Sequence, residues 1–355
     1  MNLKNQNTPI LVGLDDGHDH MKIYLGKNKV TGEPMQFKMH SRAVFGCENI
    51  GDDDKVNHER IVIGNDTYTV SESLTNFANT RNDNYPTSPL SKVLVYQALR
   101  LALAQFNIDA RNLNITSGLP VNKFYDSATR LKNQTLISAK KENLLAMSDV
   151  FNILDQQQNK PQIKIIDHTV LCEASAAYYD FILDDDGKET DQSAELGLYQ
   201  AGAAVLDIGG RTTDCIVLNP QGHNINANRS GTIDVGILEM YDQIRNTLKQ
   251  REGWSYINES ALSEAIITGV YRLGKNSYDI TEIIKTAKYS IFKRIEEFIF
   301  STIGDGSDLP AIILAGGGSY SLRDLITAKY KNTVIPEHPE FANARGFYKV
   351  LNFYV

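Results

Sequence analysis

The chain has 355 residues, 42% of them hydrophobic and 22% charged, which is enough to bury a sizeable core and suggests two domains or one large one. Its formal net charge of −7 argues against a broad nucleic-acid-binding surface, because affinity for phosphate backbones depends on clustered Lys and Arg. The three cysteines are far apart and in no CxxC spacing, which excludes a disulfide framework and a cysteine zinc site.

The N-terminus and the apolar runs predict a protein of the cytoplasm. Residues 1–9 are polar and lack the apolar core of a secretory signal. The longest apolar runs, such as residues 311–315, are far too short to span a bilayer. We therefore expect no membrane contact and a reducing compartment.

Two β-hairpins are the first elements expected in chain order. Apolar runs at residues 9–14 and 21–26 flank a charged turn, and residues 59–70 carry two strands around the turn signal GND. Residues 46–59 lie between the hairpins and are predicted to form a polar, acid-rich surface loop.

The first turn is rich in charge. The stretch VGLDDGHDHMK, residues 12–22, places two adjacent acids, a glycine, a His-Asp-His triplet and a lysine next to a strand. A metal site, a phosphate site and an ordinary solvated hairpin all fit this composition, so the rest of the chain has to decide between them.

Helix and strand alternate through the middle of the chain. Ser88 followed by Pro89 predicts the start of a helix over residues 89–106, whose apolar residues recur at spacings of three and four. The elements expected next are strands at 113–120 and 160–168, an alanine-rich helix at 172–183 and a charged linker at 184–192.

The second half repeats this alternation. We expect a hairpin from residues 201–210 and 212–219, helices over 236–250 and most of 280–301, a strand at 309–315 that runs into a glycine-rich turn and a helix, and a final strand and helix near 333–336 and 343–353. Strands that alternate with helices throughout indicate an α/β fold.

An internal repeat links the two halves. ILVGLDDGHDHMKIYL and AAVLDIGGRTTDCIVL each contain an apolar strand that ends in an Asp, a glycine two residues on, a polar tip and a second apolar strand. Such duplication implies two similar halves that face each other. The acids Asp15 and Asp207 would then point into one shared cleft.

These turns suit a polyphosphate. Glycine beside the acid lets the backbone approach a ligand, and the N–H groups of a tight turn can converge on an anion. Asp15 and Asp207 would repel phosphate unless a cation lay between them, and Mg²⁺ is the cation held by carboxylates together with phosphate oxygens. Lys22 adds a positive charge, and AGGGS at residues 315–319 offers a third close approach at a helix N-terminus.

The order of these motifs resembles the superfamily of actin, sugar kinases and heat-shock-chaperone ATPases. Within it, SGLPVNKFYD and LDIGGRTTD are similar to the actin-like plasmid-partition ATPases of the ParM/StbA family. The motifs that carry the resemblance are phosphate 1 at residues 14–22, connect 1 at 173–179, phosphate 2 at 206–214, adenosine at 311–319 and connect 2 at 343–351.

The resemblance implies an actin-like ATPase fold, in which two duplicated ribonuclease-H-like lobes enclose a nucleotide cleft. Residues 1–195 would form lobe I, with a small subdomain inserted at about 30–87. Residues 196–334 would form lobe II, with a small subdomain at about 229–280, and residues 335–355 would return to lobe I.

It also implies the site. Asp15 and Asp207 would hold Mg²⁺ through water, Glu173 would orient or deprotonate the attacking water, and Lys22 would contact phosphate. Gly236 would line the base pocket, with Asp234 beside it. The remaining nucleotide-binding candidates are Asp16, Gly17, His18, Asp19, His20, Gly209, Gly210, Arg211, Thr212, Gly316, Gly317, Gly318 and Ser319.

Two positions depart from the family pattern. His18 stands where many relatives carry a small hydroxyl residue, and we expect it to donate a hydrogen bond and to titrate near neutrality. Arg211 stands where Gly or Thr is expected, and would either reach the γ-phosphate or point to solvent. A zinc site of His18, Asp19 and His20 lacks an evident fourth ligand.

The function implied is a filament-forming ATPase that uses ATP, or GTP, with Mg²⁺. Copies would add head to tail into a helical filament, and a DNA-binding adaptor on a plasmid centromere would cap its ends, so that growth separates plasmid copies without direct contact to nucleic acid. The alternatives are a monomeric small-molecule kinase or phosphatase of the same fold and a non-hydrolysing, nucleotide-dependent cytoskeletal scaffold.

Overall fold

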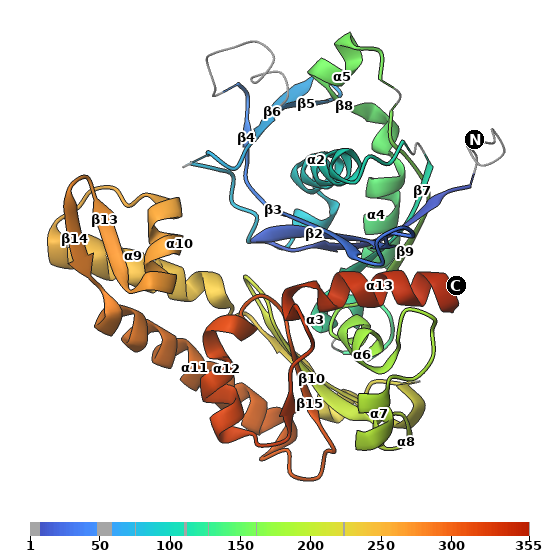
Figure 1. Cartoon of the computed structure of the whole chain (residues 1–355), viewed down its shortest axis with the longest axis vertical. Coiled ribbons are helices and arrows are strands. Elements are labelled where there is room, and N and C mark those ends of the chain that lie inside the picture. The colour runs from blue at the N-terminus through green and yellow to red at the C-terminus, as the bar shows by residue number, and fades with distance from the viewer. Residues whose placement is uncertain are drawn as a thin grey trace.

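The computed structural model describes residues 8–47, 59–74, 76–109, 112–126, 128–160, 162–222 and 224–354. Most of the predicted acid-rich loop and of the polar N-terminal tail lies outside these residues. Figure 1 shows two bodies, each built around a β-sheet, with an arm that extends from the lower one. Within the described part of the chain, no helix combines the length and the apolar character needed to cross a membrane.

The upper body contains a five-stranded sheet in the order β3-β2-β1-β7-β9. β1 and β2 form the predicted hairpin, and β1, β7 and β9 run parallel. Helices α2 and α4 cover one face and α13 the other, so the central strands are buried on both sides. The bounds are β1 (Ile10–Asp16), β2 (His20–Lys27), β3 (Pro34–His40), β7 (Asn112–Leu119), β9 (Lys164–Cys172), α2 (Pro89–Gln105), α4 (Gln134–Leu145) and α13 (Ala342–Phe353).

A smaller antiparallel sheet, β4-β6-β5-β8, sits above α2. Its central hairpin of β5 and β6 is the one predicted around GND, whereas β8 comes from a distant part of the sequence. Its strands are β4 (Ala43–Phe45), β5 (Arg60–Ile63), β6 (Asp66–Val70) and β8 (Val150–Asn152).

The lower body repeats the strand pattern of the upper one. Its sheet has the order β12-β11-β10-β15-β16, with antiparallel pairs on one side of β10 and parallel pairs on the other. This is the arrangement of β3-β2-β1-β7-β9, so the duplication seen in the sequence extends to the topology. The strands are β10 (Ala203–Ile208), β11 (Thr213–Leu218), β12 (Gly231–Ile233), β15 (Ile312–Ala315) and β16 (Thr333–Val334).

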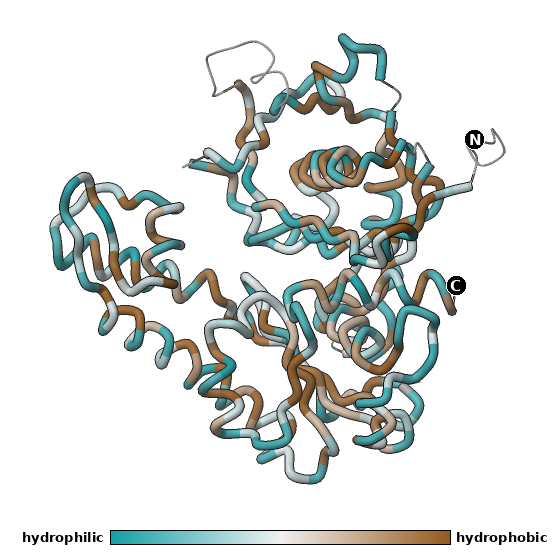
Figure 2. The backbone as a smooth tube through the Cα atoms, viewed as in Figure 1, coloured by the Kyte–Doolittle hydropathy of each residue, from teal (hydrophilic) through white to brown (hydrophobic). Residues whose placement is uncertain are grey.

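The remaining helices shape the lower body and its arm. Helices α11 and α12 contact one face of the sheet, and α6 contacts β10 and β15 on the other. Figure 2 shows hydrophobic segments along these strands and hydrophilic ones in the outer loops. The arm and helices comprise α6 (Ser175–Ile182), α7 (Asp191–Leu196), α8 (Leu198–Ala201), α9 (Ile237–Glu252), α10 (Glu259–Thr268), β13 (Val270–Leu273), β14 (Asn276–Asp279), α11 (Thr281–Ile303) and α12 (Ser319–Lys329).

Helix α13 lies between the two bodies and contacts the backbone of each. A Cβ on Gly346 would lie 1.8 Å from the carbonyl oxygen of Ala176 in α6, and a Cβ on Gly13 would lie 1.9 Å from that of Ala344. Only glycine permits such an approach. Arg345 and Lys349 of α13 also bind Asp180 of α6, at 2.6 and 2.9 Å. Since α6 packs on the lower sheet and α13 on the upper one, this helix pair couples the lobes.

Most predicted elements are present, with one difference that concerns the site. The strand predicted at 160–168 is β9, which begins later and continues to Cys172 because its backbone pairs with β7 as far as Leu119. The helix predicted from residue 172 begins only at Ser175, because Ala174 adopts a φ of +60°. Glu173 therefore lies between a strand and a helix, and the prediction that it occupies the first helical turn is wrong.

Candidate functional site

One cavity lies between the two lobes and is lined by both duplicated turns. Asp15 and Asp207, expected to share a cleft, both line it, together with the glycine-rich turn after β15. The predicted site residues around it are Asp15, Asp16, Gly17, His18, Asp19, His20, Lys22, Glu173, Asp207, Gly209, Gly210, Arg211, Thr212, Asp234, Gly316, Gly317 and Gly318.

Two predicted residues support the wall and do not line the cavity. Gly236 caps α9, and a Cβ there would lie 2.4 Å from the carbonyl oxygen of Gly210, so glycine lets the helix start against the second acidic turn. Ser319 is buried, and its hydroxyl donates to the carbonyl oxygen of Gly316 at 2.7 Å. Ile237 and Tyr241 of α9 line the cavity instead.

Each duplicated hairpin places an acid at the end of its first strand. Asp15 is opposite Lys22 in the β1–β2 register, and the Lys22 Nζ donates to Asp15 Oδ2 at 2.7 Å. Asp207 Oδ2 accepts a hydrogen bond from Asn343 of α13 at 2.6 Å. Burial raises the pKa of Asp207 to about 6, although the bond from Asn343 opposes the shift. Asn343 was not among the predicted residues.

Glu173, which is half-buried, and Asp214, which is buried, add two more carboxylates. Burial, together with the charges of Asp15 and Asp214, raises the pKa of Glu173 well above its ordinary value. A Cβ on Gly118 would lie 2.5 Å from Glu173 Cγ, so the glycine makes room for this side chain. Asp214 accepts hydrogen bonds from the Val121 N–H and the Thr232 hydroxyl, and burial raises its pKa to about 7.

Asp214 was missed as a site residue although it is the last residue of the second phosphate-type motif. The signal was an acid inside an otherwise apolar strand, TDCIVL, in which an ionised carboxylate is costly unless it is partnered. Lys140 was missed because α4 was not predicted. Its Nζ donates to Asp16 Oδ1 at 2.8 Å, and both side chains are buried.

The cavity therefore has an excess of buried negative charge at its centre. The wall of the cavity includes two ammonium groups, those of the partly buried Lys22 and the buried Lys140, and five neighbouring carboxylates, those of Asp15, Asp16, Glu173, Asp207 and Asp214. Three of these carboxylates have raised pKa values and form no salt bridge within the described part of the chain: Glu173, Asp207 and Asp214. This donor set, oxygen-rich and under mutual repulsion, fits a hard divalent cation such as Mg²⁺.

The glycine-rich turn after β15 closes the cavity on the side of the lower body. Gly316 has a φ of +82°, and a Cβ there would lie 2.3 Å from Asp207 Oδ1. Any larger residue would therefore displace the carboxylate that the cavity presents. The Gly318 N–H donates to the Ile208 carbonyl oxygen at 2.8 Å, which fixes the turn against β10.

His18 and Arg211 differ from their predictions. The His18 ring packs against the Tyr85 ring, and its Nδ1 forms a hydrogen bond with the Thr80 carbonyl oxygen at 2.8 Å. Burial, with the charge of Arg211, lowers its pKa to about 4, so the expectation of titration near neutrality is wrong. Arg211 neither points freely to solvent nor into the centre of the cavity, because it pairs with Asp83 at 3.0 Å, across the cleft, and with Asp234 at 3.7 Å.

In the ligand-free protein, Asp214 contributes less to stability as the pH rises. Because its pKa is about 7 in the fold against an ordinary 3.8, this carboxyl holds more protons in the folded than in the unfolded chain in that interval. The contribution of Asp214 to the free energy of unfolding therefore falls from pH 4 towards pH 7. Asp214→Asn keeps the acceptor oxygen and should raise the free energy of unfolding at pH 8 by about 2 to 4 kcal/mol, with little change at pH 4.

Urea unfolding of the ligand-free protein at both pH values measures this effect. Asp308→Asn is the control of opposite sign, because the hydrogen bond from Arg229 lowers the pKa of the Asp308 carboxyl. That variant should lose stability at pH 8. Equal effects of Asp214→Asn at the two pH values would contradict the burial argument.

Comparisons with known proteins agree with this architecture. Residues 13–174 match the family model for the N-terminal domain of actin-like proteins, and residues 205–328 match the model for the C-terminal part of the archaeal actin homologue MreB-like. A search of curated proteins found no match.

Solved structures align with nearly the whole chain. A 15-stranded ParM filament from Clostridium botulinum has 18% identity and a TM-score of 0.71, over 98% of this chain and 100% of that one. The archaeal actin homologue Ta0583 has 18% identity and a TM-score of 0.69, over 97% and 99%. ParM from Bacillus thuringiensis with AMPPNP has 16% identity and a TM-score of 0.64, over 97% and 98%. At such identities the likeness shows the fold.

Proposed function

Because this chain is an actin-like protein that shares its fold with ParM, we propose that it is a nucleotide-driven, filament-forming ATPase. The observation that carries the proposal is that the acidic turns of both lobes line one shared cavity. Ta0583 has been solved with ADP and Bacillus thuringiensis ParM with AMPPNP, which supports a nucleotide as the ligand here.

Asp15 and Asp207 would hold Mg²⁺ through water, and the glycine turns would bring backbone N–H groups close to the phosphates. Mg²⁺ held there would neutralise phosphate charge. Lys22 contributes the adjacent positive charge, held by Asp15 at 2.7 Å. Gly316 keeps the space beside Asp207 free of a side chain.

Glu173 is the residue of this chain best placed to accept a proton from an attacking water. It lies half-buried in the cavity wall between β9 and α6, where desolvation and the charges of Asp15 and Asp214 raise its pKa. A cation bound near these acids would lower that pKa and leave the carboxylate able to act as a base.

Nucleotide binding would favour a closed arrangement of the lobes. Arg211 with Asp83 and Arg81 with Asp242 already bridge the cleft, at 3.0 and 2.6 Å. A ligand that contacts both lobes stabilises the closed form by its differential affinity for that form. Closed subunits that add head to tail make a heterologous contact, which produces an open helical filament.

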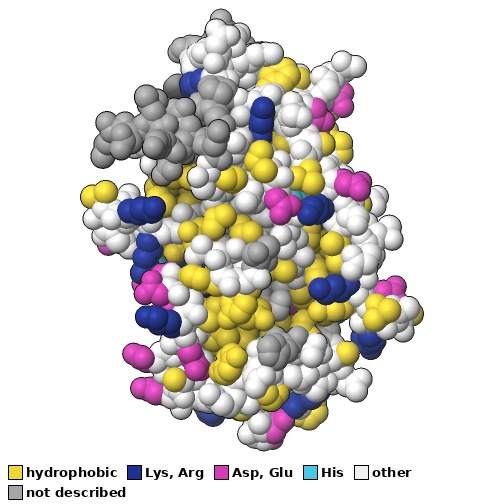
Figure 3. Space-filling view, turned by 90° about the vertical axis from the view of Figure 1, so that its right-hand side faces the viewer, with side chains coloured by type: hydrophobic (Ala, Val, Ile, Leu, Met, Phe, Trp, Pro, Cys, Tyr) yellow, Lys and Arg dark blue, Asp and Glu magenta, His cyan; other side chains and the backbone are white. Residues whose placement is uncertain are grey.

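The surface supports self-association. Figure 3 shows hydrophobic atoms gathered in one area of the face it presents, with charged side chains at the margins. Elsewhere on different elements, large apolar side chains that are exposed in the single chain include Ile166 (51%) in β9, Phe300 (62%) in α11 and Tyr354 (61%) after α13.

The finer role that we propose is plasmid segregation, with a DNA-binding adaptor on a centromere at the filament ends. The net charge of −7 supports an indirect contact with DNA. A ParM from Clostridium botulinum, with which this chain shares its fold, has been solved as a filament.

Negative-stain microscopy and light scattering of the purified chain test the proposal. Filaments should form with Mg²⁺ and ATP, disassemble as phosphate is released, and fail to form with EDTA. Polymer that forms and never disassembles would favour the non-hydrolysing scaffold. Phosphate transfer that depends on a small-molecule acceptor, without polymer, would favour the kinase.

A further inference from the structure

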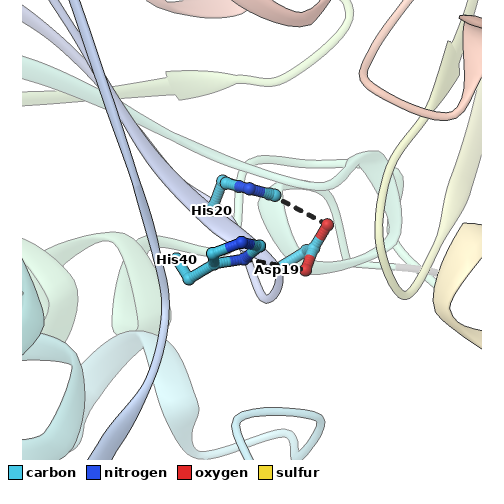
Figure 4. A group of neighbouring side chains, drawn as sticks. All are labelled: Asp19, His20 and His40. Carbon is cyan, nitrogen blue, oxygen red and sulfur yellow. Dashed lines mark hydrogen bonds and ion pairs between the residues drawn. The ribbon is translucent and has the colours of Figure 1, made fainter. Parts of the chain in front are cut away.

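Three side chains lie close together beside the cavity, and none of them belongs to the Asp15 and Asp207 pair of the proposed Mg²⁺ site. Asp19 lies at the tip of the first hairpin, His20 begins β2, and His40 ends β3 (Figure 4). One ligand atom of each, a carboxylate oxygen and two ring nitrogens, lies within 4.8 Å of the others. We propose that these residues form a binding site for a divalent transition-metal ion, of the class of Zn²⁺ or Co²⁺.

Backbone pairing holds this cluster in place. His20 and His40 are directly opposite each other in the antiparallel β2–β3 register, so their side chains share one face of the sheet. Their ring centroids are 4.0 Å apart. The Ser41 N–H donates to the Asp19 carbonyl oxygen at 2.8 Å, which ties the hairpin tip to the end of β3. The ligands are therefore supplied by strands and a fixed turn.

The carboxylate faces both imidazoles. Asp19 Oδ2 is 2.9 Å from His20 Nδ1, and Asp19 Oδ1 is 3.9 Å from His40 Nδ1. The latter nitrogen is buried and has no hydrogen-bond partner among the described residues. A metal ion would use the lone pair that hydrogen bonding leaves unused.

The outer contacts of His40 also suit a ligand. Glu72 accepts a hydrogen bond from the His40 backbone N–H at 2.8 Å, and its second carboxylate oxygen lies 3.7 Å from His40 Nε2. Metal-binding histidines commonly direct their other ring nitrogen at a carboxylate, which fixes the tautomer and the ring orientation. Glu72 would act as this positioning residue.

The site thus offers two imidazole nitrogens and one carboxylate oxygen to a bound ion. This donor set selects the class of metal. Imidazole suits Zn²⁺, Co²⁺, Ni²⁺ and Cu²⁺, whereas Mg²⁺ and Ca²⁺ prefer oxygen ligands alone. Asp19 and His20 also line the cavity, so a fourth position on the ion would face it. Three protein ligands with one open position is the arrangement typical of reactive zinc sites. His18, which stands beside Asp19 and His20 in the sequence, bonds the Thr80 carbonyl oxygen, and the third member of this cluster is His40.

Cobalt binding to the untagged, full-length chain without nucleotide tests the site. We expect one equivalent of Co²⁺ to bind with visible d–d absorption, to be displaced by Zn²⁺, and to resist a large excess of Mg²⁺. His40→Ala should weaken binding at least about tenfold and abolish the absorption bands, and Glu72→Gln should weaken it less while preserving them.

His338→Ala is the matched control, since this histidine is exposed and also lies beside a carboxylate, Glu337, at 3.8 Å. It should leave Co²⁺ affinity unchanged. Thermal melting of each variant without metal verifies folding. Absence of stoichiometric Co²⁺ binding by the wild type, or equal binding by His40→Ala, would show that the cluster is only a hydrogen-bonded support of the hairpin. Neither result depends on ATP hydrolysis or on filaments, so this test is separate from that of the proposed function.

Discussion

Asp207→Asn is expected to raise the stability of the ligand-free protein and to lower its ligand affinity. The asparagine keeps an acceptor for Asn343 but removes a buried charge whose pKa is raised to about 6. Well below pH 4 the Asp207 carboxyl is protonated in both the folded and the unfolded chain. Above pH 6 it is ionised in both, and the buried charge then costs folding free energy. The ligand-free variant should therefore be more stable at pH 8, by about 1 to 3 kcal/mol.

The same change should weaken Mg²⁺-dependent nucleotide binding about 100-fold, equivalent to about 3 kcal/mol, and prevent assembly at concentrations that suffice for the wild type. Calorimetric titration with Mg²⁺ and ATP measures the affinity, and urea unfolding measures the stability. Asp324→Asn, on the exposed surface of α12 in the same lobe, is the control for affinity. An Asp207→Asn variant with unchanged affinity would remove the cation bridge from the proposed mechanism.

Glu173→Gln is expected to separate hydrolysis from assembly. The glutamine occupies the same space between Gly118 and the cavity but cannot accept a proton. Loss of a general base commonly reduces the rate by a factor of about 100 or more. Binding and filament formation should persist, and the filaments should be longer-lived because the nucleotide stays intact.

Single-turnover phosphate release and pelleting of the polymer give the two readouts. Glu195→Gln, on the exposed face of α7, should release phosphate at the wild-type rate. Normal phosphate release from Glu173→Gln would exclude Glu173 as the base. Loss of polymer together with a lower melting temperature would instead assign it a structural role.

The two predictions rest on different parts of the lobes. Asp207 is the next-to-last residue of β10 in the lower sheet, whereas Glu173 follows β9 of the upper one. Opposite outcomes for the two variants, such as lost binding in one and lost turnover in the other, would show that binding and catalysis are divided between the lobes.

The duplicated hairpins and their acidic turns were predictable from the sequence. Alternating apolar residues, turn signals and the position of each acid at a strand end are local patterns, and local backbone preference is enough to express them. For the same reason Ser88 and Pro89 marked the start of α2 correctly, and the serine side chain accepts from the Ser91 N–H.

The partners of those residues were decided only by the tertiary structure. Lys140 pairs with Asp16 across 124 residues, Arg211 with Asp83 across 128, and Asn343 with Asp207 across 136. No periodicity in the chain specifies which distant side chain will face an acid. That choice depends on how α4 and α13 pack on the sheets.

Burial likewise set the chemistry of the titratable groups. His18 in a turn and Asp214 in a strand have pKa values that move in opposite directions, to about 4 and about 7. The sequence by itself determined the two acidic turns, because strand and turn formation are local. The three-dimensional packing decided the charge each group carries and that His40 joins Asp19 and His20, because desolvation and cross-strand contact arise only when distant segments meet.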